Sequence, residues 1–308
     1  MEIRYVEPLR RAWARMQLTL LAPFDLGKWL VIAFSAWLAG LADGIGGGSP
    51  RVGFGQHGVG ELRDAMEAAR DWFASHPYLV PVILLAVVVA VAIAIVLLWV
   101  SSLGKFVFLD NVVHNRARIV EPWRRYRRLG HSLFLWRLGF AAVGAVVAAV
   151  LAALALLVAG GLSGFTLATT RGLVAIGVAV FLAVLFLAAM AVVALCLDSF
   201  VVPVMARLDL SAVAAWGVLW PWIERYLGAF VLYGLFLLVL AIGVGVVVVV
   251  VGLLTCCVGF VLLAIPYLGT VLLLPVLVTY RAFSLEFLAQ FDPTFQLFSA
   301  AADPAPAA

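Results

Sequence analysis

The sequence predicts an all-α polytopic membrane protein with six transmembrane helices. Of its 308 residues, 66% are hydrophobic and only 12% are charged, whereas soluble domains are about half apolar and a quarter charged. Long uncharged stretches provide the roughly 20 helical residues that cross a bilayer core. None of them alternates apolar and polar residues, as a transmembrane strand would. The predicted spans cover residues 26–42, 78–100, 138–162, 173–197, 227–254 and 258–280.

The N-terminal region is predicted to form an amphipathic helix over residues 9–20 that lies in the membrane interface. Arg10, Arg11 and Arg15 fall outside its apolar face. That face consists of Leu9, Trp13, Met16 and Leu20. Pro23 then interrupts the helix, and Asp25 is a candidate N-cap of the first span. Because no cleavable signal peptide is recognisable, we expect the first span to be an uncleaved anchor.

The second predicted interfacial helix follows a glycine-rich loop. Residues 43–60 lack the preceding strand and the charged positions of a nucleotide-binding fingerprint. The helix over residues 61–73 carries more acidic than basic side chains, which suits the opposite side of the membrane. Its apolar face consists of Leu62, Met66, Ala69 and Phe73.

Basic residues concentrate between the second and third spans. The stretch from Lys105 to Arg137 holds eight of the 20 Lys and Arg residues. Near an anionic membrane each base contributes about 1 kcal/mol, screened over a Debye length of about 8 Å. The stretch can therefore bind anionic headgroups, fix the topology of the chain in the membrane, or do both. The candidate headgroup contacts are Arg116, Arg118, Trp123, Arg124, Arg125, Arg127 and Arg128.

The distribution of bases over the loops predicts the topology. Sixteen bases fall on one side of the predicted membrane and four on the other, which places both termini in the cytoplasm under the positive-inside rule. The same rule accounts for the formal charge of +4. We therefore expect no nucleic-acid partner.

Two similar phrases follow the second and fourth spans. Residues 109–113 read LDNVV and residues 197–202 read LDSFVV, each followed by an arginine and a tryptophan-containing segment. With the N-terminal helix as another copy, the pattern suggests a threefold repeat of an interfacial helix and a two-span hairpin. Asp110 and Asp198 are either helix N-caps, partners of a nearby arginine, or functional acids at membrane depth.

The last span contains residues that disturb a helix. Pro266, Gly269 and Pro275 are candidates for a kink or a gate, because proline removes a backbone donor and clashes with the preceding turn. Kinks that serve only packing are the commoner case.

Several classes of function are disfavoured. The predicted spans hold charged residues only at their ends, which argues against proton- or sodium-coupled transport. Three cysteines and four scattered histidines form no metal-binding or disulfide pattern, and no catalytic motif occurs. We expect no enzymatic activity, cofactor or metal.

The segments 106–137, 255–257 and 275–291 resemble a family of uncharacterised bacterial six-span inner-membrane proteins. This family is loosely similar to the membrane domain of some glycerophosphodiester phosphodiesterases. The resemblance covers most of residues 1–291 and implies a topology and a bacterial inner membrane. The soluble hydrolase barrel of those enzymes is absent, so the resemblance implies no chemistry.

The leading interpretation is a non-enzymatic, bacterial inner-membrane protein that organises the membrane or binds a partner, with membrane lipids contacting the Arg-rich loop. A homo-oligomer or a membrane-protein partner is compatible with it. The alternative is a channel or uncoupled transporter for a lipid or apolar molecule, gated by the last span. We expect one membrane domain over residues 1–291 and a tail over residues 292–308 that is disordered at its end.

Overall fold

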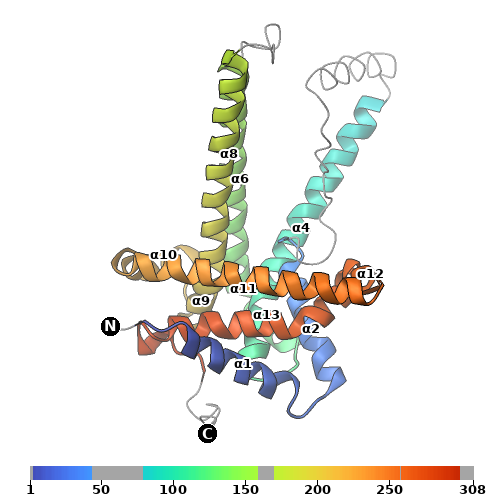
Figure 1. The fold of residues 1–308 in the computed structure, drawn as a ribbon, viewed down its shortest axis with the longest axis vertical. Helices are drawn as coiled ribbons and strands as arrows, with labels where there is room; N and C mark the ends of the chain where they lie inside the picture. Colours follow the sequence, from blue (N-terminus) through green and yellow to red (C-terminus); the bar gives the residue numbers. More distant parts are fainter. Residues whose placement is uncertain (1–2, 44–78, 159–169, 257, 299–308) are drawn as a thin grey trace. The chain divides into compact units, whose positions relative to one another are not determined.

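A computed structural model describes residues 3–43, 79–158, 170–256 and 258–298 (Figure 1). Helices are the only regular structure in these ranges, which confirms the predicted all-α class. The predicted loop beyond residue 43, the helix over 61–73 and the end of the tail lie outside the described residues. The elements are α1 Val6–Leu20, α2 Leu26–Gly40, α4 Leu79–Val113, α5 Val120–Arg125, α6 Arg127–Val158, α8 Thr170–Cys196, the π-helix η1 Leu197–Val201, α9 Val202–Leu208, α10 Ala212–Arg225, α11 Leu227–Leu254, α12 Val258–Ala264, α13 Pro266–Leu288 and the 3-10 helix η2 Pro293–Phe295.

Five helices in the described part of the chain are long and apolar enough to cross a membrane. They are α4, α6, the α8–α9 stretch, α11 and α13. The first predicted span forms α2, a shorter apolar helix of 15 residues. The six predicted crossings thus correspond to five long helices and one short helix.

The chain divides into two compact units. Unit 1 comprises Met1–Ser49, Leu98–Arg137 and Ala191–Ala308, and unit 2 comprises Pro50–Leu97 and Leu138–Met190. In unit 2, α6 and α8 run side by side (Figure 1), and a Cβ added at Gly144 would lie 2.8 Å from Met190 Cε. Large apolar side chains such as Val143 and Leu185 are exposed there, as expected of helices that face lipid.

The core of unit 1 contains the C-terminal third of α4, where every residue from Ser101 to Val112 is buried. The sequence placed the end of this span at residue 100 because polar residues follow, but the helix continues to Val113. These polar side chains are satisfied inside the protein. Ser101 Oγ donates to the Ala39 carbonyl at 2.7 Å, and Asn111 Nδ2 donates to Ser35 Oγ at 3.3 Å. Buried polar groups with such partners do not need water, so the helix can extend past them.

Helix α1 lies along α13 (Figure 1), and its buried face differs from the predicted one. Met16 and Leu20 are buried as predicted, whereas Trp13 is 51% exposed. Arg15, expected on the polar face, is buried because Glu286 of α13 pairs with it. The predicted cap of α2 is confirmed, since the Asp25 carboxylate accepts hydrogen bonds from the Gly27 and Lys28 amides.

The last predicted span is two helices. Helix α12 ends at Ala264, Ile265 is extended with ψ 116°, and α13 begins at Pro266 and continues to Leu288. A Cβ at Gly269 would lie 2.6 Å from the Leu263 carbonyl oxygen, so this close turn requires glycine.

Pro275, in contrast, lies inside α13 and does not end it. Its missing amide would have bonded the carbonyl of Val271. The indole nitrogen of Trp29 donates to that carbonyl at 3.1 Å, so the freed acceptor is satisfied by α2.

Candidate lipid-binding segment and a buried charge cluster

Asp110 organises the junction between α4 and α5. Its buried carboxylate accepts hydrogen bonds from the Arg116 guanidinium, the closest at 3.0 Å, and from the Tyr126 hydroxyl at 3.2 Å. Burial, and then the charge of Asp110, raises the pKa of Tyr126. The N-cap interpretation of Asp110 is wrong, because this residue lies in the last turn of α4 rather than before a helix. The alternative of an arginine partner is correct.

Asp198 occupies the corresponding phrase after the fourth span, inside η1. It is not an N-cap either, because the helix continues on both sides of it. Its carboxylate lies 2.6 Å from Lys105 Nζ. The two predicted acids therefore have different basic partners.

The structure adds a parallel between these two junctions. Asn115 and Asp209 adopt left-handed φ angles of 51° and 52°, after α4 and α9 respectively. A short tryptophan-containing helix follows each of them, α5 after Asn115 and α10 after Asp209. Each of these helices has a tyrosine as its C-cap, Tyr126 or Tyr226, directly before the next long helix. The third, N-terminal copy of the repeat stays a prediction.

The predicted headgroup residues lie together between the end of α4 and the start of α6. Trp123 is half-buried and packs edge-on against Trp99, with ring centroids 6.0 Å apart. Half of the arginines pair with carboxylates. These pairs are Arg116 with Asp110, Arg118 with Glu121 at 2.6 Å, and Arg128 with Asp209 at 2.5 Å. The hydrogen bond from Arg118 is the main cause that lowers the pKa of Glu121, so this carboxylate stays ionised.

Arg124, Arg125 and Arg127 are the other half, and they are exposed. No carboxylate of the described residues lies within 4.0 Å of them. The guanidinium carbon of Arg125 lies 5.4 Å from the centroid of the adjacent Tyr126 ring. Six arginines with three carboxylate partners leave a surplus of three positive charges at this surface.

A buried charge cluster in unit 1 was not predicted. Lys105 is 4% exposed, and its Nζ lies 2.5 Å from Asp43 and 2.6 Å from Asp198. Arg137 also pairs with Asp43 and donates hydrogen bonds to Ser101 and Ser102. The sequence signal was Lys105 itself, which was assigned to the loop after the second span because that span was predicted to end at residue 100.

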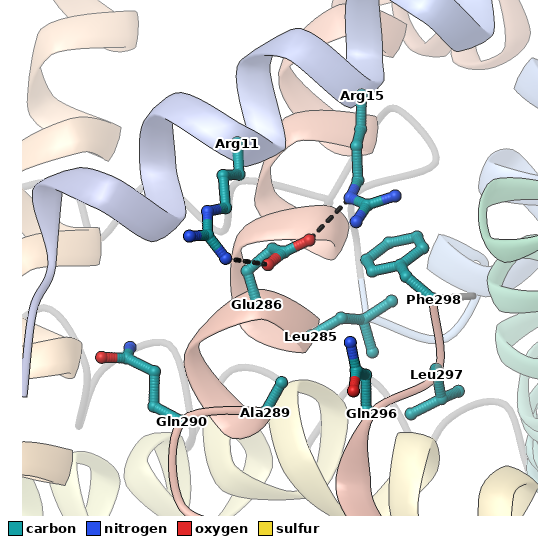
Figure 2. Close-up of a pocket in the computed structure, with 9 residues that line it drawn as sticks. All are labelled: Arg11, Arg15, Leu285, Glu286, Ala289, Gln290, Gln296, Leu297 and Phe298. Atoms are coloured by element: carbon teal, nitrogen blue, oxygen red, sulfur yellow. Dashed lines mark hydrogen bonds and ion pairs between the residues drawn. The ribbon is translucent and has the colours of Figure 1, made fainter. Parts of the chain in front are cut away.

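A polar pocket of about 280 Å³ lies between α1, α13 and the segment after η2 (Figure 2). Arg15 and Arg11 extend from α1 toward the Glu286 carboxylate, at 2.6 and 4.0 Å (Figure 2). The Arg15 guanidinium also lies 3.8 Å from the centre of the Phe298 ring. Together these contacts fix the start and the end of the described chain on α13.

The described residues include no group of three His, Cys, Asp or Glu side chains arranged to hold a metal ion. Cys196 and Cys256 are free thiols.

A model of a family of unknown function, DUF7544, matches residues 4–291. No curated protein and no solved structure matches the chain. The resemblance to the membrane domain of glycerophosphodiester phosphodiesterases therefore gains no support. Because the family model covers almost the whole sequence, the chain belongs to the family of unknown function DUF7544.

Proposed function

We propose that this protein is a non-enzymatic membrane protein that binds anionic lipid headgroups through the segment from Val120 to Arg128, and so organises lipids or a membrane partner around it. The observation that carries the proposal is the surplus of three exposed arginines, Arg124, Arg125 and Arg127, beside the half-buried Trp123. Arginine suits phosphate because its planar fork can donate two hydrogen bonds to one group.

The position of these bases is unfavourable for helix stability alone. Arg127 and Arg128 begin α6, and the first turn of this helix has no acidic residue. A helix N-terminus carries a partial positive charge, so acidic side chains are stabilising there and bases are not. A bound anion would offset both the helix dipole and the arginine charges. This supports ligand binding over a purely structural role.

Native mass spectrometry of the full-length protein, purified in a neutral detergent with equal amounts of phosphatidylglycerol and phosphatidylcholine, tests the proposal. We expect the wild type to retain phosphatidylglycerol preferentially. The R124Q/R125Q/R127Q variant should retain less phosphatidylglycerol than the wild type, because each base contributes about 1 kcal/mol near anionic lipid.

The R4Q/R207Q/R225Q variant is the matched control, because it also removes three exposed arginines of unit 1. It should keep the preference for phosphatidylglycerol. Equal losses in the two variants would show that net charge, and not this segment, determines lipid binding.

Uncoupled transport of a lipid or apolar molecule is the second candidate function, favoured by the break between α12 and α13 at Ile265. Single cysteines placed along residues 262–279 distinguish the two. Reaction with an aqueous thiol reagent throughout this range would favour a water-accessible path, whereas reaction only at its ends would favour the lipid-organising role.

A further inference from the structure

A cavity of about 250 Å³ in unit 1 combines apolar walls with fixed charges. Its polar lining includes Lys105, Asp198, Tyr280 and Arg281, and its apolar lining includes Leu237 and Leu277. We infer that this cavity binds the anionic headgroup of an amphiphile, with Arg281 as the recognition residue. The site is separate from the exposed arginine segment and does not depend on the function proposed for it.

The charges around the cavity do not cancel. Lys105 and Arg137 are matched by the carboxylates of Asp43 and Asp198, which they contact directly. Arg281 is a further cation, so the cluster has one positive charge in excess. Ionisable residues within membrane-spanning helices are costly and are usually retained for function.

Arg281 is half-buried in α13 and has few polar partners. One guanidinium nitrogen donates to the Asp198 backbone carbonyl at 2.6 Å, and the guanidinium carbon lies 5.9 Å from the centre of the Phe108 ring. Within the described ranges, no carboxylate forms an ion pair with this side chain. A guanidinium has five N–H donors, so most of them are available to a phosphate or carboxylate in the cavity.

The backbone beside Arg281 is also unusual. Asp198 and Ser199, which line the cavity, belong to the five-residue π-helix η1. Short π-helical turns inside α-helices are frequent at functional sites, because they change which groups a helix presents. Here the turn presents the carbonyl that positions the Arg281 guanidinium.

An apolar groove shares a lining residue with the cavity, and it would hold the acyl chain of the amphiphile. It has a volume of about 390 Å³ and is lined by α1, α11 and α13, with Trp13, Leu240 and Val276 among its residues. Tyr280 lines both the groove and the cavity. One acyl chain in the groove and its anionic headgroup beside Arg281 would match the polarity of both places.

Thermal unfolding of the full-length protein in a neutral detergent, followed by tryptophan fluorescence, tests this inference. The probes are dioctanoyl phosphatidylglycerol, dioctanoyl phosphatidylcholine and inorganic phosphate at matched concentrations. We expect phosphatidylglycerol to raise the midpoint temperature in a saturable way, and more strongly than the other two probes, because binding to the folded state stabilises it.

Three variants locate the site. R281Q should reduce the shift with phosphatidylglycerol, and L237W should reduce it by filling the cavity without altering any charge. R124Q/R125Q/R127Q should retain the shift, because it alters only the exposed segment. Since R281Q and L237W act by different means, a folding defect in one leaves the other informative.

Two results would overturn the inference. The first is that L237W or a folded R281Q protein keeps the full rise in midpoint temperature with phosphatidylglycerol. The second is that phosphatidylcholine raises the wild-type midpoint as much as phosphatidylglycerol does. If inorganic phosphate alone gave the entire shift, the cavity would be a free-anion site, and the assignment of the groove to an acyl chain would be wrong.

Discussion

At the residue scale, Lys105 connects elements that are distant in the sequence. Its Nζ contacts Asp43, just after α2, and Asp198 in η1. Removing one partner of a fully buried ion pair costs about 3–5 kcal/mol. The cost here is smaller, because the Asp198 side chain is 38% exposed and water can solvate its charge. Asp43 keeps Arg137 as a partner, so the loss of Lys105 affects Asp198 most.

The K105M variant should therefore be clearly less stable in detergent than the wild type. Thermal unfolding should show a lower midpoint, and K105M/D198N should recover part of the loss because the unpaired carboxylate is removed. K28M is the matched control, since the other lysine of the chain makes an exposed contact to Asn115. A midpoint in K105M as high as in K28M would show that the buried cluster does not stabilise the fold.

Arg15 and Glu286 show why residue roles were harder to predict than helices. Arg15 was placed outside the apolar face of the N-terminal helix, yet it is 7% exposed. Its partner is 271 positions away in the sequence, so no local pattern indicates the pair. Asp25, by contrast, caps α2 through amides two and three positions away, and the local sequence predicted it.

At the element scale, α4 packs closely against α2. A Cβ at Gly104 would lie 2.7 Å from the backbone nitrogen of Ala39 and from the carbonyl carbon of Leu38. Both are main-chain atoms, so the two helices would have to separate. Overpacking of this kind costs about 1–3 kcal/mol.

We expect G104A to lower the thermal midpoint, whereas G217A should leave it unchanged or raise it. A Cβ at Gly217 in α10 meets no atom within 4 Å, and alanine is favoured over glycine in a helix by about 1 kcal/mol. Thermal unfolding of the two purified variants provides the comparison. Equal behaviour would contradict the close packing of α2 and α4.

The apolar stretches predicted the long helices well, because length and the absence of charge suffice for this. The predicted helix ends were wrong where contacts within the protein, and not water, satisfy the polar groups of a helix. Helix α4 extends past residue 100 because Ala39, Asp43 and Ser35 satisfy its polar side chains. Likewise, the Trp29 indole makes Pro275 tolerable within α13. The predicted headgroup segment forms α5 and the start of α6, but its division into paired and unpaired arginines depends partly on Asp209, which is distant in the sequence.

At the scale of the whole molecule, the central claim is that the chain crosses the membrane and gathers its bases on one side, where they meet anionic headgroups. Sixteen bases fall on the side of the Arg-rich segment and four on the other, by the predicted topology. Arg127 begins α6, and Arg171 lies at the start of α8. If α6 spans the bilayer, these two positions lie on opposite sides.

Cysteine accessibility tests this claim most directly. Cys196, Cys256 and Cys257 are first replaced by serine, and R127C or R171C is then introduced singly. A membrane-impermeant maleimide is applied to intact cells and to inside-out vesicles. The account predicts that R127C reacts only in the vesicles and R171C only in the intact cells. Reaction of both positions from the same side would contradict it.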